Sequence, residues 1–141
     1  MATDRQEQAV RAYYAASEAS DGEAVGALVT DGAKWWVPQS AAAQGIPRPV
    51  VGRNQLIEHF WGTARYRVGS RTWTIERLIT SGDCVAAQAT MTATMAGGAP
   101  YTNQYVYVFR FEGSKIAEVW EYLDTAYFFQ QKAAGGPGPG D

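Results

Sequence analysis

One carboxylate on an otherwise apolar strand is the residue of this chain best suited to chemistry. Residues 115–123 are typical of a strand in which Val119, Glu121 and Leu123 share one face. Burying an unpaired carboxylate is costly, and apolar surroundings raise its pKa toward the range useful to a general acid or base. We therefore predict that Glu121 is catalytic. The alternative is a glutamate that is solvated at the rim of the sheet or paired with an arginine.

Tyrosine hydroxyls are the second group with chemical capacity. Residues 101–111 are typical of a strand whose odd positions are nearly all aromatic, and Tyr105 and Tyr107 are among them. Tyr13 lies on the apolar face of an expected first helix. Because a tyrosine hydroxyl is a donor at neutral pH, Tyr13 and Tyr107 are predicted to polarise a substrate carbonyl. The alternative is an ordinary core ring whose hydroxyl bonds to the backbone.

The apolar and aromatic residues around these groups are predicted to form a deep, mostly apolar pocket for a small hydrophobic molecule. Asn103 shares a face with Tyr105 and Tyr107 and can orient a polar group of the substrate. The same side chains are also typical of a hydrophobic core, so the depth at which each one is buried decides whether it lines the pocket or belongs to the core. The predicted substrate-binding residues are Trp36, Val37, Phe60, Trp61, Met91, Asn103, Tyr105 and Val119.

Composition excludes several classes of protein. The 141 residues are 13% aromatic and only 18% charged, and the formal net charge is −2, which argues against a nucleic-acid binder. One cysteine and one histidine allow neither an internal disulfide nor a Cys- or His-rich metal site, so no metal or other cofactor is predicted. No apolar run approaches the ~20 residues of a membrane span. The N-terminal residues lack the apolar core of a signal peptide, so the expected location is the cytoplasm.

The elements that must position these side chains follow from hydrophobic periodicity, which is helical in the first half of the chain and alternating in the second. Helices are expected at residues 3–19, 21–29 and 54–64, with a turn at 30–32, a short strand at 33–37 and a loop at 38–51. Long strands are expected at residues 66–80, 84–95, 101–111 and 115–123. This order indicates an α+β fold in which three helices cover one face of a strongly curved mixed or antiparallel sheet, forming a cone. Residues 1–132 are expected to form the single domain, and the Gly/Pro-rich residues 133–141 a disordered tail.

The opposite face of the expected sheet has no segment left to cover it. It carries Val106, Val108, Trp120 and Tyr122. An exposed apolar patch of this kind marks an interface, so a homodimer through the outer sheet face is predicted.

Four segments together resemble a known family. They are Val10-Arg11-Ala12-Tyr13-Tyr14 followed by Asp21, Ala27-Leu28-Val29-Thr30-Asp31-Gly32-Ala33, Gly52-Arg53-Asn54-Gln55-Leu56-Ile57-Glu58-His59-Phe60, and Lys115-Ile116-Ala117-Glu118-Val119-Trp120-Glu121-Tyr122-Leu123-Asp124. In this order and spacing the chain resembles the NTF2-like superfamily, specifically its SnoaL-like polyketide cyclase branch, which is related to ketosteroid isomerase and limonene epoxide hydrolase. The resemblance covers about residues 5–130. It implies the cone-shaped fold and sheets that pair back to back.

The resemblance carries over only part of the isomerase site. There a tyrosine on the first helix and a protonated aspartic acid on the third long strand donate hydrogen bonds to the developing enolate. Tyr13 matches the tyrosine position, and Tyr107 stands where the aspartic acid would be. The aspartate base of the isomerase aligns with Val37, so the same route lacks its base.

The cyclase and hydrolase motifs are also partial. The last strand of SnoaL-like cyclases typically contains Glu-His-Trp-Asp, and here it contains Glu118-Val119-Trp120-Glu121, with the histidine lost and the acid kept. In limonene epoxide hydrolase an Asp at the Glu121 position works with an Arg and an Asp, whose places here are taken by Ala89 and Met91. The triad that activates water is therefore not assembled.

These features together predict a cofactor-independent tailoring enzyme acting on an apolar polyketide-type substrate, most simply a cyclase. Such an enzyme folds a flexible substrate into a reactive geometry. Hydrogen bonds or acid/base steps assist the closure, and a pericyclic closure would need no proton transfer. The alternatives are a ketosteroid-isomerase-like isomerase, an epoxide hydrolase and a non-catalytic hydrophobic ligand-binding protein.

Overall fold

The computed structural model describes residues 2–61 and 65–134. In chain order the elements are α1 (Ala2–Glu18), α2 (Gly22–Leu28), β1 (Val29–Trp36), α3 (Gln39–Ala42), β2 (Val50–Val51), α4 (Arg53–Trp61), β3 (Thr72–Ser81), β4 (Cys84–Thr94), β5 (Pro100–Glu112), β6 (Lys115–Leu123) and α5 (Thr125–Ala134). The expected α+β class is confirmed.

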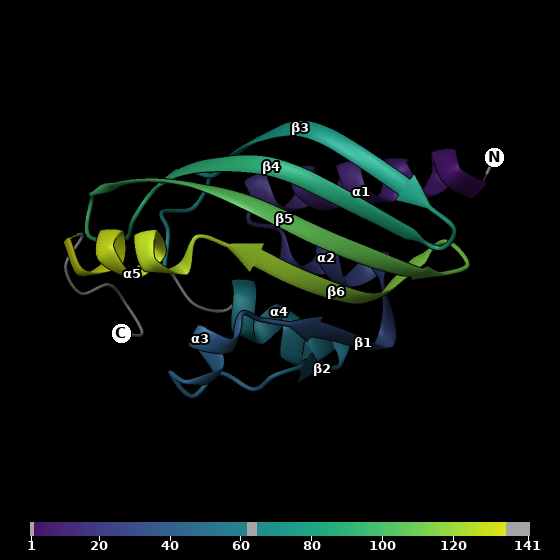
Figure 1. Cartoon of the computed structure of the whole chain (residues 1–141), viewed down its shortest axis with the longest axis horizontal. Helices are drawn as coiled ribbons and strands as arrows, with labels where there is room; N and C mark the ends of the chain where they lie inside the picture. The colour runs from purple at the N-terminus through teal and green to yellow at the C-terminus, as the bar shows by residue number, and fades with distance from the viewer. Residues whose placement is uncertain (1, 62–64, 135–141) are drawn as a thin grey trace.

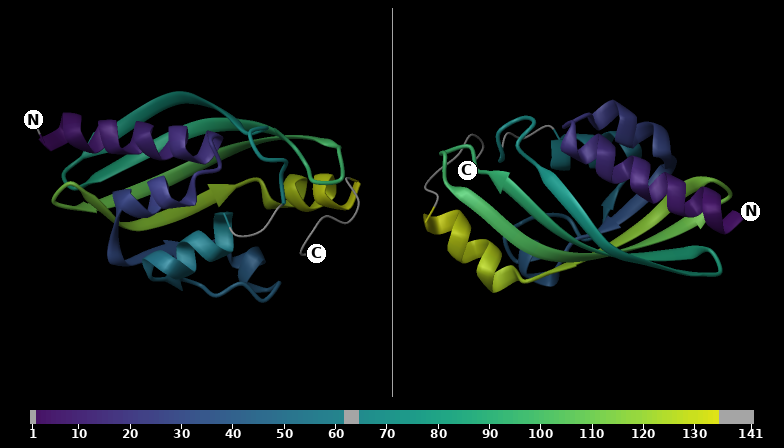
Figure 2. Two further views of the ribbon diagram at one scale, coloured as in Figure 1. Left: turned by 180° about the vertical axis from the view of Figure 1, so that it is seen from behind. Right: turned by 90° about the horizontal axis from the view of Figure 1, so that it is seen from above.

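All strands of the described residues belong to one mixed sheet in the order β2-β1-β6-β5-β4-β3. β1 runs parallel to β6, and the other neighbouring pairs are antiparallel. The long strands curve strongly, and α1 and α2 lie across the concave face (Figures 1 and 2). The parallel pair brings the first strand of the chain against the last, which a meander alone would not do.

Alternation along the strands decides what faces the helices. In β4 and β5 every odd position from Val85 to Phe111 is buried or nearly so within the strands, while the even positions are more exposed. The predicted strand faces are therefore confirmed. Ala87 and Ala89 pair with Tyr107 and Tyr105 across the sheet. Their small side chains leave room above β4 for the aromatic rings.

The first strand begins earlier than the sequence suggested. The expected turn at residues 30–32 lies inside β1, where its register with β6 shifts between Val29 and Lys34. Arg53 of α4 holds this irregular segment: its guanidinium forms an ion pair with Asp31 at 2.7 Å and donates to the Val29 carbonyl at 2.8 Å. Arg53 thus ties this segment of β1 to α4 through tertiary contacts.

Three short elements and one strand boundary also differ from expectation. The expected loop at 38–51 contains α3 and β2, and the expected strand at 66–80 is shortened to β3, with Tyr66 reduced to an isolated bridge to Met95. α5 follows β6 directly; the Asp124 carboxylate accepts from the Tyr127 N–H at 3.0 Å. α5 extends through Ala134, so residues 133 and 134 of the expected tail are helical and residues 135–141 lie outside the described part.

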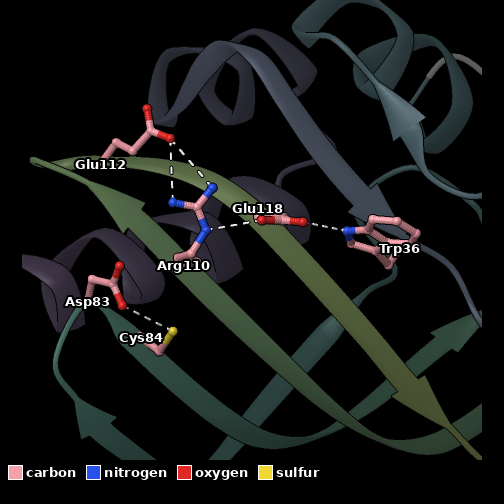
Figure 3. A network of polar contacts seen from close by, with 6 residues as sticks. All are labelled: Trp36, Asp83, Cys84, Arg110, Glu112 and Glu118. Carbon is pink, nitrogen blue, oxygen red and sulfur yellow. Dashed lines mark hydrogen bonds and ion pairs between the residues drawn. The ribbon is translucent and has the colours of Figure 1, made fainter.

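The convex face of the sheet carries a row of apolar side chains. Cross-strand register aligns Ile79 with Ala86, Ala86 with Val108, Val108 with Trp120, and Trp120 with Trp36. A polar row lies beside it, in which Glu118 accepts from Arg110 Nε at 3.0 Å and from Trp36 Nε1 at 2.7 Å (Figure 3). No described segment of the chain covers this face.

We propose that two copies pair through this apolar row. Sedimentation at micromolar concentration should then give twice the 15.3 kDa mass of the chain. Val108→Lys places a charge in the middle of the row and should shift the protein to monomer, because burying an unpaired charge is costly. The control is Val68→Lys, at an apolar side chain that is 81% exposed in a loop. A wild-type protein that sediments only as a monomer would contradict the pairing.

Candidate active site

A cavity of about 420 Å³ lies between the concave face of the sheet and the helices. Its wall is contributed by α1, α3, α4 and α5 together with β1 and β3–β6. This size is in the range of small-molecule sites. Among the described residues, its lining combines many aromatic rings with one carboxylate and several cations.

Glu121 lies on this wall because β6 is sandwiched between β1 and β5. Its cross-strand neighbour on β5 is Tyr107. On the other side the indole of Trp35 from β1 donates from Nε1 to the carboxylate Oε1 at 2.7 Å. The parallel β1–β6 pairing therefore supplies the donor that fixes the carboxylate.

Burial raises the pKa of Glu121 from its ordinary value of 4.5 to about 7. The hydrogen bond from Trp35 and the positive charge of Arg65 oppose this rise, but desolvation is larger. At neutral pH the carboxyl is therefore close to evenly divided between its two protonation states. Such a group can both accept and return a proton.

Two tyrosines meet beside this carboxyl. The rings of Tyr13 and Tyr107 pack edge to face with centroids 5.9 Å apart, and both residues line the cavity. Burial raises the pKa of both hydroxyls, and the charge of Glu121 raises them further. Both therefore stay neutral and keep the proton that a hydrogen-bond donor needs.

The rest of the wall is largely aromatic. Trp35 packs against Phe60 with ring centroids 4.9 Å apart, and Trp73 packs against Tyr105 at 5.1 Å. Of the predicted binding residues, the structure places Val37, Phe60, Met91 and Tyr105 on the cavity wall.

Four other predicted binding residues are not placed there. Trp36 faces the convex side and donates to Glu118, because consecutive residues of a strand point to opposite faces. Asn103 and Val119 are buried in the core and are not among the described residues that line the cavity. The Asn103 amide is instead used internally, donating to the Tyr101 hydroxyl at 3.1 Å and to the Asp124 carbonyl at 3.0 Å. Trp61 ends α4, and its side chain lies outside the described part of the structure.

Several lining residues were missed by sequence reasoning. Strand parity could have found Trp35, since it shares a face with Val37. The helix after β6 was not predicted, although Thr125, Phe128, Phe129 and Lys132 have the spacing of one helical face and all line the cavity. Arg65 and Arg71 both precede β3 and reach the cavity only through the tertiary fold.

Two further properties follow from the part of the chain that the structure describes. It contains no group of three or more His, Cys, Asp or Glu side chains arranged to hold a metal ion. Its helices are all too short or too polar to traverse a bilayer.

The raised pKa of Glu121 makes stability depend on pH. A carboxyl whose folded-state pKa lies above its unfolded value binds protons more tightly in the folded state. The free energy of unfolding therefore falls as the pH rises from about 4.5 through about 7, because the carboxyl must then ionise at a buried position. Glu121→Gln removes the ionisable group and with it this loss of stability. We expect the variant to match the wild type near pH 5 and to exceed its free energy of unfolding by about 1–3 kcal/mol above pH 8, measured by urea denaturation.

Glu118→Gln is the matched control on the other face of the same strand. Desolvation raises the Glu118 pKa, but hydrogen bonds from Trp36 and Arg110 outweigh it and hold the pKa below its usual value. The control should therefore be less stable than the wild type at neutral pH, a difference of opposite sign. Identical pH profiles for Glu121→Gln and the wild type would contradict the raised pKa.

Comparison with known proteins gives a family and a fold. The family model for the SnoaL-like domain matches residues 10–119. No curated protein matches the chain significantly. Among solved structures, an NTF2-like protein of unknown function from Burkholderia pseudomallei is 22% identical, with a TM-score of 0.76 over 90% of this chain and 96% of that chain.

Two further structures are similar. A candidate SnoaL-like polyketide cyclase from Jannaschia sp. CCS1 is 15% identical, with a TM-score of 0.81 over 96% of each chain. IdmH, a candidate polyketide cyclase from Streptomyces antibioticus, is 19% identical, with a TM-score of 0.73 over 91% of this chain and 98% of that chain. At these identities the likeness establishes the fold. With its curved mixed sheet, its helices on the concave face and the family match over most of its length, this chain belongs to the SnoaL-like domain family.

Proposed function

We propose that the protein is a cofactor-independent cyclase that closes a ring in a polyketide-type substrate through an enol or enolate. The observation that carries this proposal is the Glu121 carboxyl, whose pKa is about 7, in a cavity that it shares with the hydroxyls of Tyr13 and Tyr107. One group can move a proton near neutral pH, and the other two can donate to an oxygen. Together these are the requirements of enolisation.

The chemistry assigned to these residues is a balanced addition. The Glu121 carboxylate takes a proton from the carbon next to a substrate carbonyl, and Tyr13 or Tyr107 donates to the oxygen on which negative charge develops. The enolate carbon then attacks a second carbonyl of the same molecule and forms the new carbon–carbon bond. Glu121 returns its proton to the alkoxide, so the mass of the product equals that of the substrate.

The aromatic wall has a separate role in this proposal. Trp35, Phe60, Trp73 and Tyr105 present flat, apolar surfaces that hold a flexible chain in a folded conformation. Bringing reacting carbons together in this way contributes several kcal/mol to catalysis. The names of two similar structures support the substrate class, since IdmH and the Jannaschia protein are candidate polyketide cyclases.

Glu121→Gln is the decisive variant. Linear polyketide precursors are incubated with the protein, and a product of unchanged mass but altered absorbance and chromatographic retention is sought. We expect Glu121→Gln to lower kcat at least about 100-fold, because general acid/base catalysis is worth that much. The wild-type rate should rise with pH through about 7, as the carboxylate form of the base becomes populated. Glu118→Gln, on the convex face, should keep the wild-type rate and profile.

Tyr107→Phe tests the hydrogen-bond donor. Loss of one donor to the developing oxyanion should lower kcat about 10- to 100-fold while leaving the pH midpoint near that of the wild type. Full activity in Glu121→Gln with loss in Tyr107→Phe would remove the acid/base role and favour closure assisted by hydrogen bonds alone. Ligand binding without turnover in any variant, the wild type included, would instead indicate a non-catalytic binding protein.

A further inference from the structure

Positive charge is concentrated around the cavity of a chain that is negative overall. Arg65, Arg71 and Lys132 line the cavity, and Glu121 is the only acidic residue among the described residues that line it. The formal net charge of the chain is −2. The excess of cations is therefore local, and the catalytic proposal above does not account for it.

Each of the two arginines lies over an aromatic ring. The Arg65 guanidinium carbon lies 5.5 Å from the ring centroid of Phe128, and that of Arg71 lies 5.1 Å from the ring centroid of Tyr66. Among the described residues neither arginine forms a salt bridge, whereas Arg53 and Arg110 both do. An aromatic face orients a guanidinium and leaves its N–H donors available.

Arg65, Arg71 and Tyr66 all line the same cavity. The charges of both lower the pKa of Tyr66, against a larger rise from burial, so both lie near that hydroxyl. One Arg71 nitrogen, Nη1, also donates to the Ser17 carbonyl and to the Ser20 hydroxyl, each at 3.4 Å, which ties it to the end of α1. The cavity wall therefore contains two guanidinium groups in addition to the hydroxyls of Tyr13 and Tyr107.

We propose that the natural substrate is anionic, with an apolar body that fills the aromatic part of the cavity and a carboxylate held by Arg65 and Arg71. A guanidinium presents paired N–H donors that match the two oxygens of a carboxylate. The proposal deepens the proposed function, since it concerns the same cavity. It adds a specificity subsite beside the groups that move protons, since the charge of Arg65 also acts on Glu121.

Two fluorescent dyes of one skeleton test this charge preference without a known substrate. Anilinonaphthalene sulfonate carries an anionic group, and N-phenylnaphthylamine is the same ring system without it. The wild type should bind the sulfonate dye at least about tenfold more tightly than the neutral dye. Equal affinities, or failure of the sulfonate dye to bind at all, would overturn the proposal.

Variants of the two arginines then test whether Arg65 and Arg71 cause the preference for the anionic dye. Arg65→Gln and Arg71→Gln should each weaken binding of the sulfonate dye about tenfold and change binding of the neutral dye less than about twofold. Arg71→Lys keeps the charge and should restore part of the preference, which guards against a folding defect. Parallel loss of both dyes in the glutamine variants, or no loss of either, would contradict the assignment.

Arg77→Gln is the matched control, because Arg77 is an exposed arginine of β3 aligned with Gln88 beside the apolar row of the convex face. A dye that binds to the convex face would respond to this variant and not to the other two, and that outcome would overturn the cavity assignment. The test is independent of catalysis, since neither dye reacts. Glu121→Gln should lose turnover but still bind the sulfonate dye more tightly than the neutral dye. The experiments can therefore contradict the anion subsite without contradicting the catalytic role of Glu121, and the reverse.

Discussion

The hydrogen bond from the Trp35 indole to the Glu121 carboxylate is the interaction on which the site depends. It joins the first and last strands of the chain across their parallel pairing, and it places a neutral indole donor against a carboxyl whose pKa is raised by desolvation. One neutral donor is enough to orient the group but not enough to offset its burial. A salt bridge in the same place would have held the pKa low and removed the capacity to accept a proton near neutrality.

The two carboxylates of β6 show how strongly position decides chemistry. Glu118 and Glu121 are three residues apart and each accepts from a tryptophan indole at 2.7 Å. Glu118 faces the convex side, where Arg110 also binds it and its pKa is lowered. Glu121 faces the cavity, where no arginine forms a salt bridge with it among the described residues, and its pKa is raised. Glutamate thus forms a structural ion pair on the convex face of β6, whereas on the cavity face it is a group whose pKa lies near neutral pH.

The cavity exists because small and large side chains alternate between strands. Ala87 and Ala89 of β4 lie beside Tyr107 and Tyr105 of β5. Because the alanine side chains are small, the space above β4 is not filled by large side chains from both strands. Helices complete the enclosure: α1 contributes Tyr13, and α5 brings Phe128 and Lys132 to the wall. The result is a space that combines flat apolar surfaces with charge, which suits a substrate of mixed character.

Alternation in the sequence was sufficient to determine the strand faces, and with them the inward position of Glu121, Tyr105 and Tyr107. The helices of the first half and the α+β class also follow from local periodicity, because each element must bury one face. Only the tertiary structure decided which inward residues reach open space: Asn103 and Val119 face inward yet lie in the core. It also decided the partners of Glu121, because Trp35 and Arg65 are remote in sequence and come close only through the β1–β6 pairing and the curvature of the sheet. A side chain's face is a local property of the strand, whereas its solvation and its neighbours depend on contacts that the chain makes only once it is folded.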